Sequence, residues 1–500
     1  MNAPERLRPA FIATGSGAAP ATKGLFIDGA VCQAVSGKTF DSTSPSTGEL
    51  LARVAQAGKE DVDVAVAAAR RAFEGEWSRF KPFDRQQVML RLAELVEKHY
   101  DEIALLDTLD MGGPISRTTL GRRRAVALLR YYAGLATSTR GDTVPNSAAG
   151  DVFAYTLKEP VGVVGAINPW NGPSGLTIWK LCPVLASGCT LVLKPAEQAP
   201  LSPLFIAELA MQAGLPPGVF NVITGFGDAG AALAEHHGVD KIAFTGSTEV
   251  GQKIVRAAAG NMKRMSMELG GKSPDIVFAD ADLEAAVPGA AMAVFQNSGQ
   301  ICSAGTRLFV QRPIYEAFVQ RVAAFAKTLK VGNPLDPATQ LGPVVSAEQL
   351  DRVTGYLALG KEQGARAVAG GGRLTEGDLA RGYYVEPTVF ADVRDDMRIA
   401  REEIFGPVIS ALPFETLDEV VARANDSSYG LGSGVWSRNV NTVHKVARGL
   451  RTGTVWANCY QVMDPAIPFG GYKMSGFGRE SGVEHLQEYL QTKAVIMKLD

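Results

Sequence analysis

The strongest constraint in this 500-residue sequence is a regular alternation of apolar and helix-like segments between residues 161 and 258. Short runs rich in Val, Ile, Leu and Phe occur at 161–167, 190–194, 219–225 and 241–246. Such runs are typical of strands buried on both faces. Helix-like segments separate them, at about 174–187, at 202–213 and from Ser247 onward. This spacing predicts a parallel, doubly wound α/β sheet, which binds ligands at the carboxyl ends of its strands.

Helices precede this region and a second α/β region follows it. Apolar repeats at helical spacing begin at Val62 and Val88, and an Arg-rich helix is predicted over about 116–137. The second helix is expected to open at a cap-like pair, Asp84 and Gln87. From Pro274 onward, strands are predicted near 274–278, 305–311, 407–414 and 453–460, with a helix over about 313–329 and a Gly-rich loop at 370–382.

The last residues, 488–500, read as a strand with too little chain beyond it to build its own sheet. We expect this strand to pair with 151–160 in a small bridging sheet. A two-stranded extension is not stable alone, and exposed strands invite pairing with another subunit. The sequence therefore predicts a homodimer or a homotetramer.

Composition excludes several classes of protein. The net charge is −2, which does not favour binding to nucleic acid or to an anionic membrane. No apolar run approaches the roughly 18 residues of a membrane span, and the N-terminus lacks the apolar core of a secretory signal. Five cysteines without CxxC spacing, and histidines without HExxH, predict neither disulfides nor a metal site. These features favour a cytoplasmic protein. The absence of GxSxG argues against a serine hydrolase.

Cys302 is the first candidate catalytic residue. It follows the polar, Gly-containing stretch 296–300 and precedes a short apolar run. This pattern suggests a loop that leads into a helix or a strand. At a helix N-terminus the backbone N–H groups would stabilise a nucleophilic thiolate. The alternative is an inert buried cysteine.

Glu268 is the second candidate. It lies between Met267 and Leu269 at the end of a predicted strand, and Gly270-Gly271 follows. Burial there would raise the pKa of its carboxyl into the range of a general base. The alternative is a structural ion pair with Lys272 or Arg264.

Three segments resemble nucleotide loops. The stretch 225–230 matches GxGxxG, but Asp228 would stand where a phosphate should lie. The stretch 246–251 also joins a strand to a helix and carries two hydroxyl groups. Lys194 and Glu197 follow another strand, where an acid can hold the ribose hydroxyls of NAD and repel a 2′-phosphate.

Taken together, these segments resemble the aldehyde dehydrogenase superfamily, in matching order and spacing, from about residue 25 to the C-terminus. The matching segments are Asn168–Asn171, Lys194–Glu197, Phe244–Gly251, Met267–Lys272, Gly299–Cys302, Glu402–Pro407 and Pro468–Gly476.

The resemblance implies a role for each matching residue. Cys302 would be the nucleophile, Glu268 the base for deacylation and Asn171 an oxyanion donor, while Lys180 and Glu480 would assist proton relay. Residues implied for the cofactor are Ile167, Trp170, Lys194, Glu197, Gly227, Gly246, Ser247, Leu269, Glu403 and Phe405. Gly227 would lie beside the adenine, so GxGxxG is not the phosphate site. The residues implied for the aldehyde tunnel are Gly172, Leu176, Trp179, Gln296, Ile301, Ser303, Met463 and Phe469.

The implied activity is NAD-dependent oxidation of an aldehyde to a carboxylate, with NADP less favoured because Glu197 repels its extra phosphate. Gly172, Gln296 and Met463 carry no ring, which predicts a tunnel wide enough for bulky, aromatic or polar aldehydes. Two alternatives remain. A CoA-acylating relative usually lacks an acid matching Glu268, and a non-catalytic binding protein would not need Cys302 and Asn171 together.

The implied domains are a flexible tail at 1–22 and an NAD-binding domain at 23–141 and 159–272. A catalytic domain is expected at 273–484, and oligomerisation strands at 142–158 and 485–500.

Overall fold

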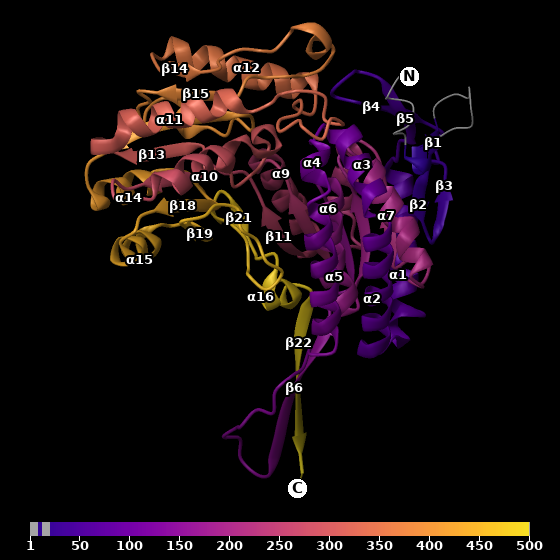
Figure 1. The fold of residues 1–500 in the computed structure, drawn as a ribbon. Helices are drawn as coiled ribbons and strands as arrows, with labels where there is room; N and C mark the ends of the chain where they lie inside the picture. Colours follow the sequence, from indigo (N-terminus) through magenta and orange to yellow (C-terminus); the bar gives the residue numbers. More distant parts are fainter. Residues whose placement is uncertain (1–8, 13–20, 500) are drawn as a thin grey trace.

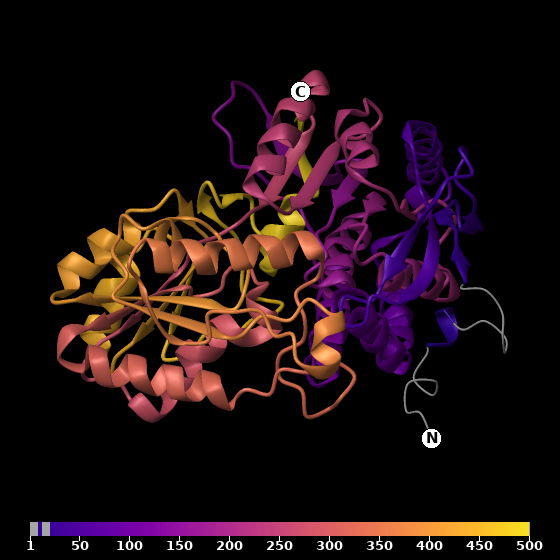
Figure 2. The ribbon, with the colours of Figure 1, turned by 90° about the horizontal axis from the view of Figure 1, so that it is seen from above.

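The computed structural model describes residues 9–12 and 21–499. Two α/β bodies lie side by side, each built on its own sheet, and a long two-stranded ribbon projects from them (Figures 1 and 2). This arrangement confirms the predicted fold class. Among the described residues, no helix is both long and apolar enough to cross a membrane.

The first sheet has eight strands in the order β21-β11-β10-β7-β8-β9-β2-β3. Its five central strands are parallel: β7 (Val163–Ile167), β8 (Thr190–Lys194), β9 (Phe220–Val222), β10 (Lys241–Thr245) and β11 (Arg264–Glu268). Its edges are antiparallel: β2 (Leu25–Ile27), β3 (Ala30–Cys32) and β21 (Gly476–Phe477). The chain runs outward from β7 to β8 and β9, then returns to β10 on the other side. The sheet is therefore doubly wound, with its switch point between β7 and β10.

Helices cover both faces of this sheet because its strands are apolar on both sides. Leu191 and Leu193 of β8 pack in the core with α2 (Pro82–Lys98), α3 (Tyr100–Met111), α5 (Gly121–Ala136), α6 (Pro173–Ser187) and α7 (Leu201–Gln212). Val192, between them, packs on the opposite face with α1 (Lys59–Glu74), α8 (Gly227–Glu235) and α9 (Thr248–Ala258).

The second sheet has seven strands in the order β14-β15-β16-β13-β12-β18-β19. Their bounds are β12 (Pro274–Val277), β13 (Arg307–Gln311), β14 (Arg366–Ala369), β15 (Thr388–Ala391), β16 (Val408–Phe414), β18 (Gly432–Trp436) and β19 (Thr454–Ala457). One face packs on α10 (Leu283–Phe295) and α11 (Tyr315–Thr328). The other packs on α12 (Ala347–Glu362), α14 (Leu417–Asn425) and α15 (Val440–Gly449).

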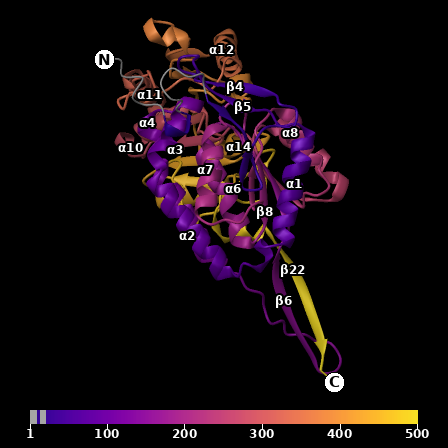
Figure 3. The same ribbon diagram turned by 90° about the vertical axis from the view of Figure 1, so that its right-hand side faces the viewer.

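The ribbon pairs β6 (Val152–Pro160) with β22 (Leu490–Lys498) in antiparallel register, from Leu490 opposite Pro160 to Lys498 opposite Val152. It extends away from both bodies (Figures 1 and 3). The predicted pairing of the terminal strand with 151–160 is confirmed. The domain boundaries that we derived from the sequence stay a prediction.

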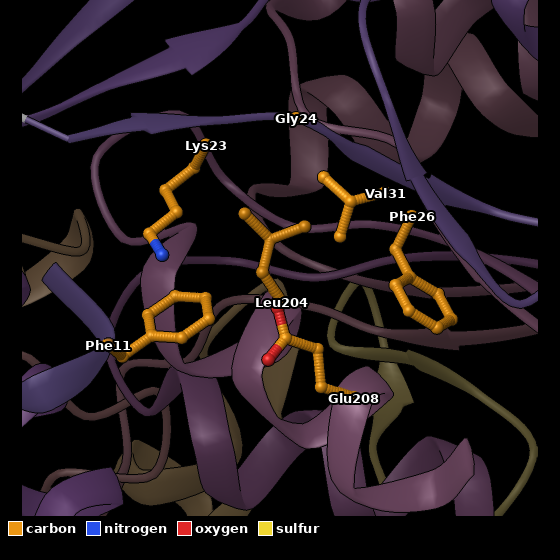
Figure 4. A pocket seen from close by; sticks show the side chains of 7 residues that line it. All are labelled: Phe11, Lys23, Gly24, Phe26, Val31, Leu204 and Glu208. Carbon is orange, nitrogen blue, oxygen red and sulfur yellow. The ribbon is translucent and has the colours of Figure 1, made fainter.

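The N-terminal segment differs from the expected tail where it is described. Residues 1–8 and 13–20 lie outside the described residues, but Ala10–Ile12 form a short 3-10 helix in which Ile12 is fully buried. The Phe11 N–H donates to Glu102 at 2.8 Å, and the Lys23 ammonium lies 3.6 Å from the centre of the Phe11 ring. Figure 4 shows the small hollow that Phe11 and Lys23 border with Leu204 and Glu208.

Two helix boundaries also differ from expectation. The Arg-rich segment is divided into α4 (Ile115–Thr118) and α5, rather than one helix over 116–137. Helix α2 begins at Pro82, two residues before the expected cap, because proline suits a first helical turn. Asp84 still caps this end, since its carboxylate accepts the Lys81 N–H at 2.9 Å.

Candidate active site

Cys302 lies in a turn that precedes β13, and not at a helix N-terminus, so that part of the expectation is wrong. Burial, together with the charges of Glu403 and Glu268, raises the pKa of its thiol to about 12. A backbone hydrogen bond from Ser303 opposes this effect. In the free protein the thiol is therefore protonated, and a nearby base must remove the proton before attack.

Glu268 ends β11, and its side chain is buried. Within the described part of the chain, neither carboxyl oxygen has a hydrogen-bond partner. Burial raises the pKa of this carboxyl well above its usual range, and the charge of Glu480 adds to the shift. A Cβ atom at Gly470 would lie only 2.8 Å from Glu268 Oε1, so the glycine makes room for the carboxyl group.

The alternative of a structural ion pair for Glu268 is not seen. Arg264 donates instead to the Leu490 carbonyl at 2.7 Å, and the buried Lys272 ammonium has no hydrogen-bond partner in the described residues. An unpaired, buried carboxyl of this kind is available to take a proton from water or a thiol.

Asn171 is linked to the Cys302 loop by a ring of amide hydrogen bonds. Its Nδ2 donates to the Gln300 carbonyl at 2.9 Å. Asn297 Nδ2 donates to the backbone carbonyls of both Asn171, at 3.1 Å, and Gln300, at 3.3 Å. On its other side, Asn297 Oδ1 accepts from Arg117 at 3.0 Å. These bonds fix the distance between Asn171 and the backbone of the cysteine turn.

Lys180 of α6 and Glu480 form a buried ion pair. The backbone of Glu480 also pairs with that of Phe469, at 2.6 and 2.7 Å. The charges of both Glu480 and Lys180 act on Glu268, so the pair lies near the candidate base.

The predicted cofactor residues on the first sheet gather at its switch point. Ile167, Lys194 and Gly246 follow the carboxyl ends of the neighbouring strands β7, β8 and β10, and Leu269 follows β11. Lys194 Nζ lies 3.2 Å from Glu197 Oε2. A Cβ atom at Gly230 would lie 3.8 Å from Ile167 and 4.0 Å from Lys194, which places α8 over this edge.

Two helices open toward the same edge. Ser247 caps α9, with its hydroxyl accepting the Val250 N–H at 3.3 Å. Gly227 is the first residue of α8, and a Cβ atom there would meet no atom within 4 Å. The first turn of α8 thus leaves open space at Gly227, and the N–H groups of a first helical turn suit an anion.

The remaining predicted cofactor residues come from outside the first sheet's strands. Glu403 Oε1 accepts the Gly271 N–H at 2.9 Å, and burial raises the pKa of this carboxyl to about 7. The rings of Phe405 and Trp170 meet edge to face, with centroids 5.3 Å apart.

Half of the predicted tunnel residues share one apolar cluster with Cys302. That cluster includes Leu176, Trp179, Met463 and Phe469, and the rings of Trp179 and Phe469 lie 5.9 Å apart. The remaining tunnel residues lie beside α6 or on the cysteine loop: Gly172 precedes α6, and Gln296, Ile301 and Ser303 lie on the loop.

The structure adds residues that sequence reasoning missed. Arg124 of α5 lies over Trp179, with its guanidinium carbon 4.2 Å from the ring centroid. Asn297 and Arg117 support the cysteine loop. In the sequence, Arg124 lies in a helix that was assigned to packing, and Asn297 lies in a polar loop. Arg124 is far from Trp179 in the sequence, and Asn297 is far from Asn171, so only the fold brings each pair together.

The chain is similar to known proteins over almost its whole length. Residues 32–495 match the family model described as "Aldehyde dehydrogenase family". The chain is 50% identical to the mitochondrial benzaldehyde dehydrogenase of Antirrhinum majus, over 95% of this chain and 89% of the relative. It superposes on an NAD+ complex of aldehyde dehydrogenase from Bacillus cereus with a TM-score of 0.93 and 48% identity, over 96% of this chain and 97% of that one.

A second solved structure, an indole-3-acetaldehyde dehydrogenase complexed with NAD+, matches with a TM-score of 0.95 and 44% identity over 99% of both chains. These matches span almost the whole chain, and they confirm the resemblance that we drew from seven short segments. The chain belongs to the aldehyde dehydrogenase family.

Proposed function

We propose that this protein oxidises aldehydes to carboxylates with NAD as the hydride acceptor, through a thioester on Cys302. The observation that carries the proposal is that the charge of a buried carboxyl, Glu268, acts on a partly buried thiol, Cys302, and that this carboxyl has no hydrogen-bond partner among the described residues. Each supplies one half of a thioester cycle, the nucleophile and the base.

The residues at the switch point fit NAD. Glu197 can hold the ribose hydroxyls of the adenosine half, and the first turn of α9 at Ser247 can hold the pyrophosphate. The buried Glu403 can hold the second ribose, with Phe405 beside the nicotinamide. The negative charge of Glu197 disfavours the 2′-phosphate of NADP, while Lys194 beside it softens that preference. When bound, NAD accepts the hydride that leaves the substrate.

The side chains of this protein account for the remaining steps. Glu268 takes the thiol proton, and Cys302 Sγ attacks the aldehyde carbon to form a thiohemiacetal. The resulting oxyanion accepts hydrogen bonds from the Cys302 N–H and from Asn171 Nδ2, whose second N–H is free because only one donates to Gln300. Loss of hydride leaves a thioester.

After the thiol proton has left Glu268 for solvent, the ionised carboxylate takes a proton from the water that hydrolyses the thioester, which releases the product carboxylate and the thiol. The buried Lys180–Glu480 pair lies beside Glu268 and can pass the proton onward. An oxyanion donor of this type is worth about 3 kcal/mol in related acyl-transfer sites.

The test is an assay of the purified protein with benzaldehyde and NAD. We expect one NADH and one benzoate per aldehyde consumed, and a higher kcat/KM with NAD than with NADP. Turnover that required CoA and released an acyl-CoA would favour the CoA-acylating alternative. NAD binding without aldehyde turnover would favour a binding protein.

We also propose a cytoplasmic homodimer or homotetramer. The five cysteines are all free, as expected in a reducing compartment. The projecting β6–β22 ribbon exposes apolar side chains, including Ile496 and Leu499, that a second subunit would cover.

A further inference from the structure

Arg124 stands at the wall of the apolar cluster that contains Cys302. It extends from α5 toward α6 and covers the Trp179 ring, which lies 5.9 Å from the Phe469 ring. Both rings pack in the cluster against which Cys302 lies. A cation is therefore held beside the two rings that would flank an aldehyde.

Arg124 and Trp179 both carry donors without partners. Arg124 Nη2 and Trp179 Nε1 are buried, and neither has a hydrogen-bond partner among the described residues. In the same part of the chain, no ion pair is formed by Arg124, whereas Arg122, two residues earlier, pairs with Asp101. Buried N–H donors without acceptors are rare because desolvation is costly. Two such donors, on side chains that stack on each other, indicate that a bound ligand supplies the acceptor.

The carboxylate whose charge acts on Arg124 already has another role. Glu480 is paired with Lys180. Burial lowers the pKa of Arg124, and the charge of Glu480 partly offsets this. The guanidinium thus remains a desolvated cation that an anionic ligand would stabilise.

We infer that Arg124 and Trp179 bind a carboxylate at the far end of the substrate, so that the preferred aldehydes carry an anionic group separated from the aldehyde by a ring or short chain. The planar guanidinium matches a carboxylate, and the indole N–H adds a third donor. The spacer would stack between Trp179 and Phe469, with its aldehyde at Cys302. This inference rests on the proposed function and names its substrate class.

The geometry also allows another role for Arg124, which the test must separate. Its charge could support the Cys302 thiolate, and in that case every aldehyde would depend on it equally. Recognition of a distal carboxylate would instead change the ratio of kcat/KM between an anionic and a neutral aldehyde of the same size.

The experiment compares 4-carboxybenzaldehyde with 4-methylbenzaldehyde. We expect the wild type to prefer the carboxylate, and Arg124→Met to lower the ratio of the two kcat/KM values about 30-fold, as expected for loss of a hydrogen bond to a charged group. Arg124→Lys should keep part of the preference. Trp179→Phe, which retains a ring and removes the N–H, should lower the ratio by a smaller factor. Arg122→Met is the matched control and should leave the ratio unchanged.

A second measurement does not depend on the folding of a variant. Terephthalate should inhibit the wild type more strongly than 4-methylbenzoate, and the difference should shrink as salt is added. Equal inhibition by both acids, or a substrate ratio that Arg124→Met changes less than threefold, would overturn the inference. If the wild type turns over benzaldehyde but prefers 4-methylbenzaldehyde, the inference fails and the proposed function stands. If it oxidises no aldehyde, the proposed function itself fails.

Discussion

At the scale of single residues, the site is built from ionisable groups that burial has separated from partners. Burial shifts the pKa of Cys302 to about 12 and that of Glu403 to about 7, and it raises the pKa of Glu268 well above its usual range. Each shift favours the neutral form, so Cys302 must lose its proton before it attacks, and Glu268 must be ionised before it can act as a base.

Replacement of the nucleophile tests the centre of the proposal. Cys302→Ala should lower aldehyde turnover at least about 1000-fold, because no thioester can form. NAD binding should persist, since the candidate nucleotide residues lie on other loops. Turnover is measured by NADH formation, and NAD binding is measured by titration with NAD. Cys32→Ala, on the outer strand β3, is the matched control and should retain full activity. Turnover by Cys302→Ala within tenfold of the wild type would contradict the assignment.

Replacement of Glu268, the proposed base, separates formation of the thioester from its hydrolysis. Glu268→Gln should still release a single-turnover burst of NADH, if a slower route removes the thiol proton, while steady-state turnover falls about 100-fold. Rapid-mixing kinetics measure both phases. Glu284→Gln changes an exposed carboxylate that pairs with Arg321, and it should change neither phase. Loss of the burst together with turnover would assign Glu268 to proton removal from Cys302 alone.

The raised pKa of Glu268 also sets the direction of a pH effect. A base must be ionised, and the ionised fraction of a carboxyl group with a raised pKa increases as pH rises. Steady-state turnover should therefore increase with pH through neutrality, and the increase should disappear in Glu268→Gln. A profile that is flat from acid to alkaline pH in the wild type would contradict this prediction.

The residue scale also shows what motifs reveal and what they do not. Cys302, Glu268 and Asn171 could be predicted because each lies in a short segment with a family pattern. The burial of Glu268 was foreseen from its apolar neighbours. Arg124 could not be predicted, because its contact with Trp179 depends on how α5 packs against α6. Sequence separation says nothing about such a contact.

At the scale of elements, buried strands were the most predictable feature. The runs at β7, β8 and β10 carry apolar side chains on both faces, so few structures other than central parallel strands suit them. The ends of helices and strands were less predictable. The division between α4 and α5 has no proline to mark it, and β9 keeps only three residues of the predicted seven because its neighbours turn into loops.

The prediction at the scale of elements concerns the loop that follows α10. Asn297 has φ 53°, in the left-handed region, and its amide joins Asn171 to Gln300. Asn297→Gly keeps this backbone accessible and removes the amide. We expect kcat to fall about tenfold, the effect of a lost hydrogen bond, while the KM for NAD stays nearly unchanged.

A double-mutant cycle decides whether Asn297 acts through Asn171. In an Asn171→Ala background, Asn297→Gly should cost much less than it does in the wild type. Ser298→Ala is the control from the same loop. Ser298 also has a positive φ, of 54°, but its hydroxyl donates away from the site, to the Gly342 carbonyl at 2.7 Å. Additive losses, or an equal loss in Ser298→Ala, would refute the positioning role of Asn297.

At the scale of the whole molecule, the exposed apolar side chains of the β6–β22 ribbon are the feature that packing within one chain explains least. Ile496 is 72% exposed and Leu499 is 60% exposed, on a pair of strands that contacts little else. We expect Ile496→Asp with Leu499→Asp to convert the assembly into 53.0 kDa monomers, as measured by light scattering after gel filtration. Val35→Asp, an exposed apolar position away from the ribbon, is the control. An unchanged molar mass would contradict this prediction.

The ribbon also fixes an order of events during synthesis. Lys158 of β6 bonds to Thr492 of β22, which lies 334 residues later. At roughly 5–20 residues per second, β6 waits about 20–70 s on the ribosome before its partner strand emerges. During that interval both α/β bodies can acquire most of their chain, while the surface proposed for subunit contact does not yet exist. The proposed assembly through the ribbon would therefore begin only after β22 has been made and paired with β6.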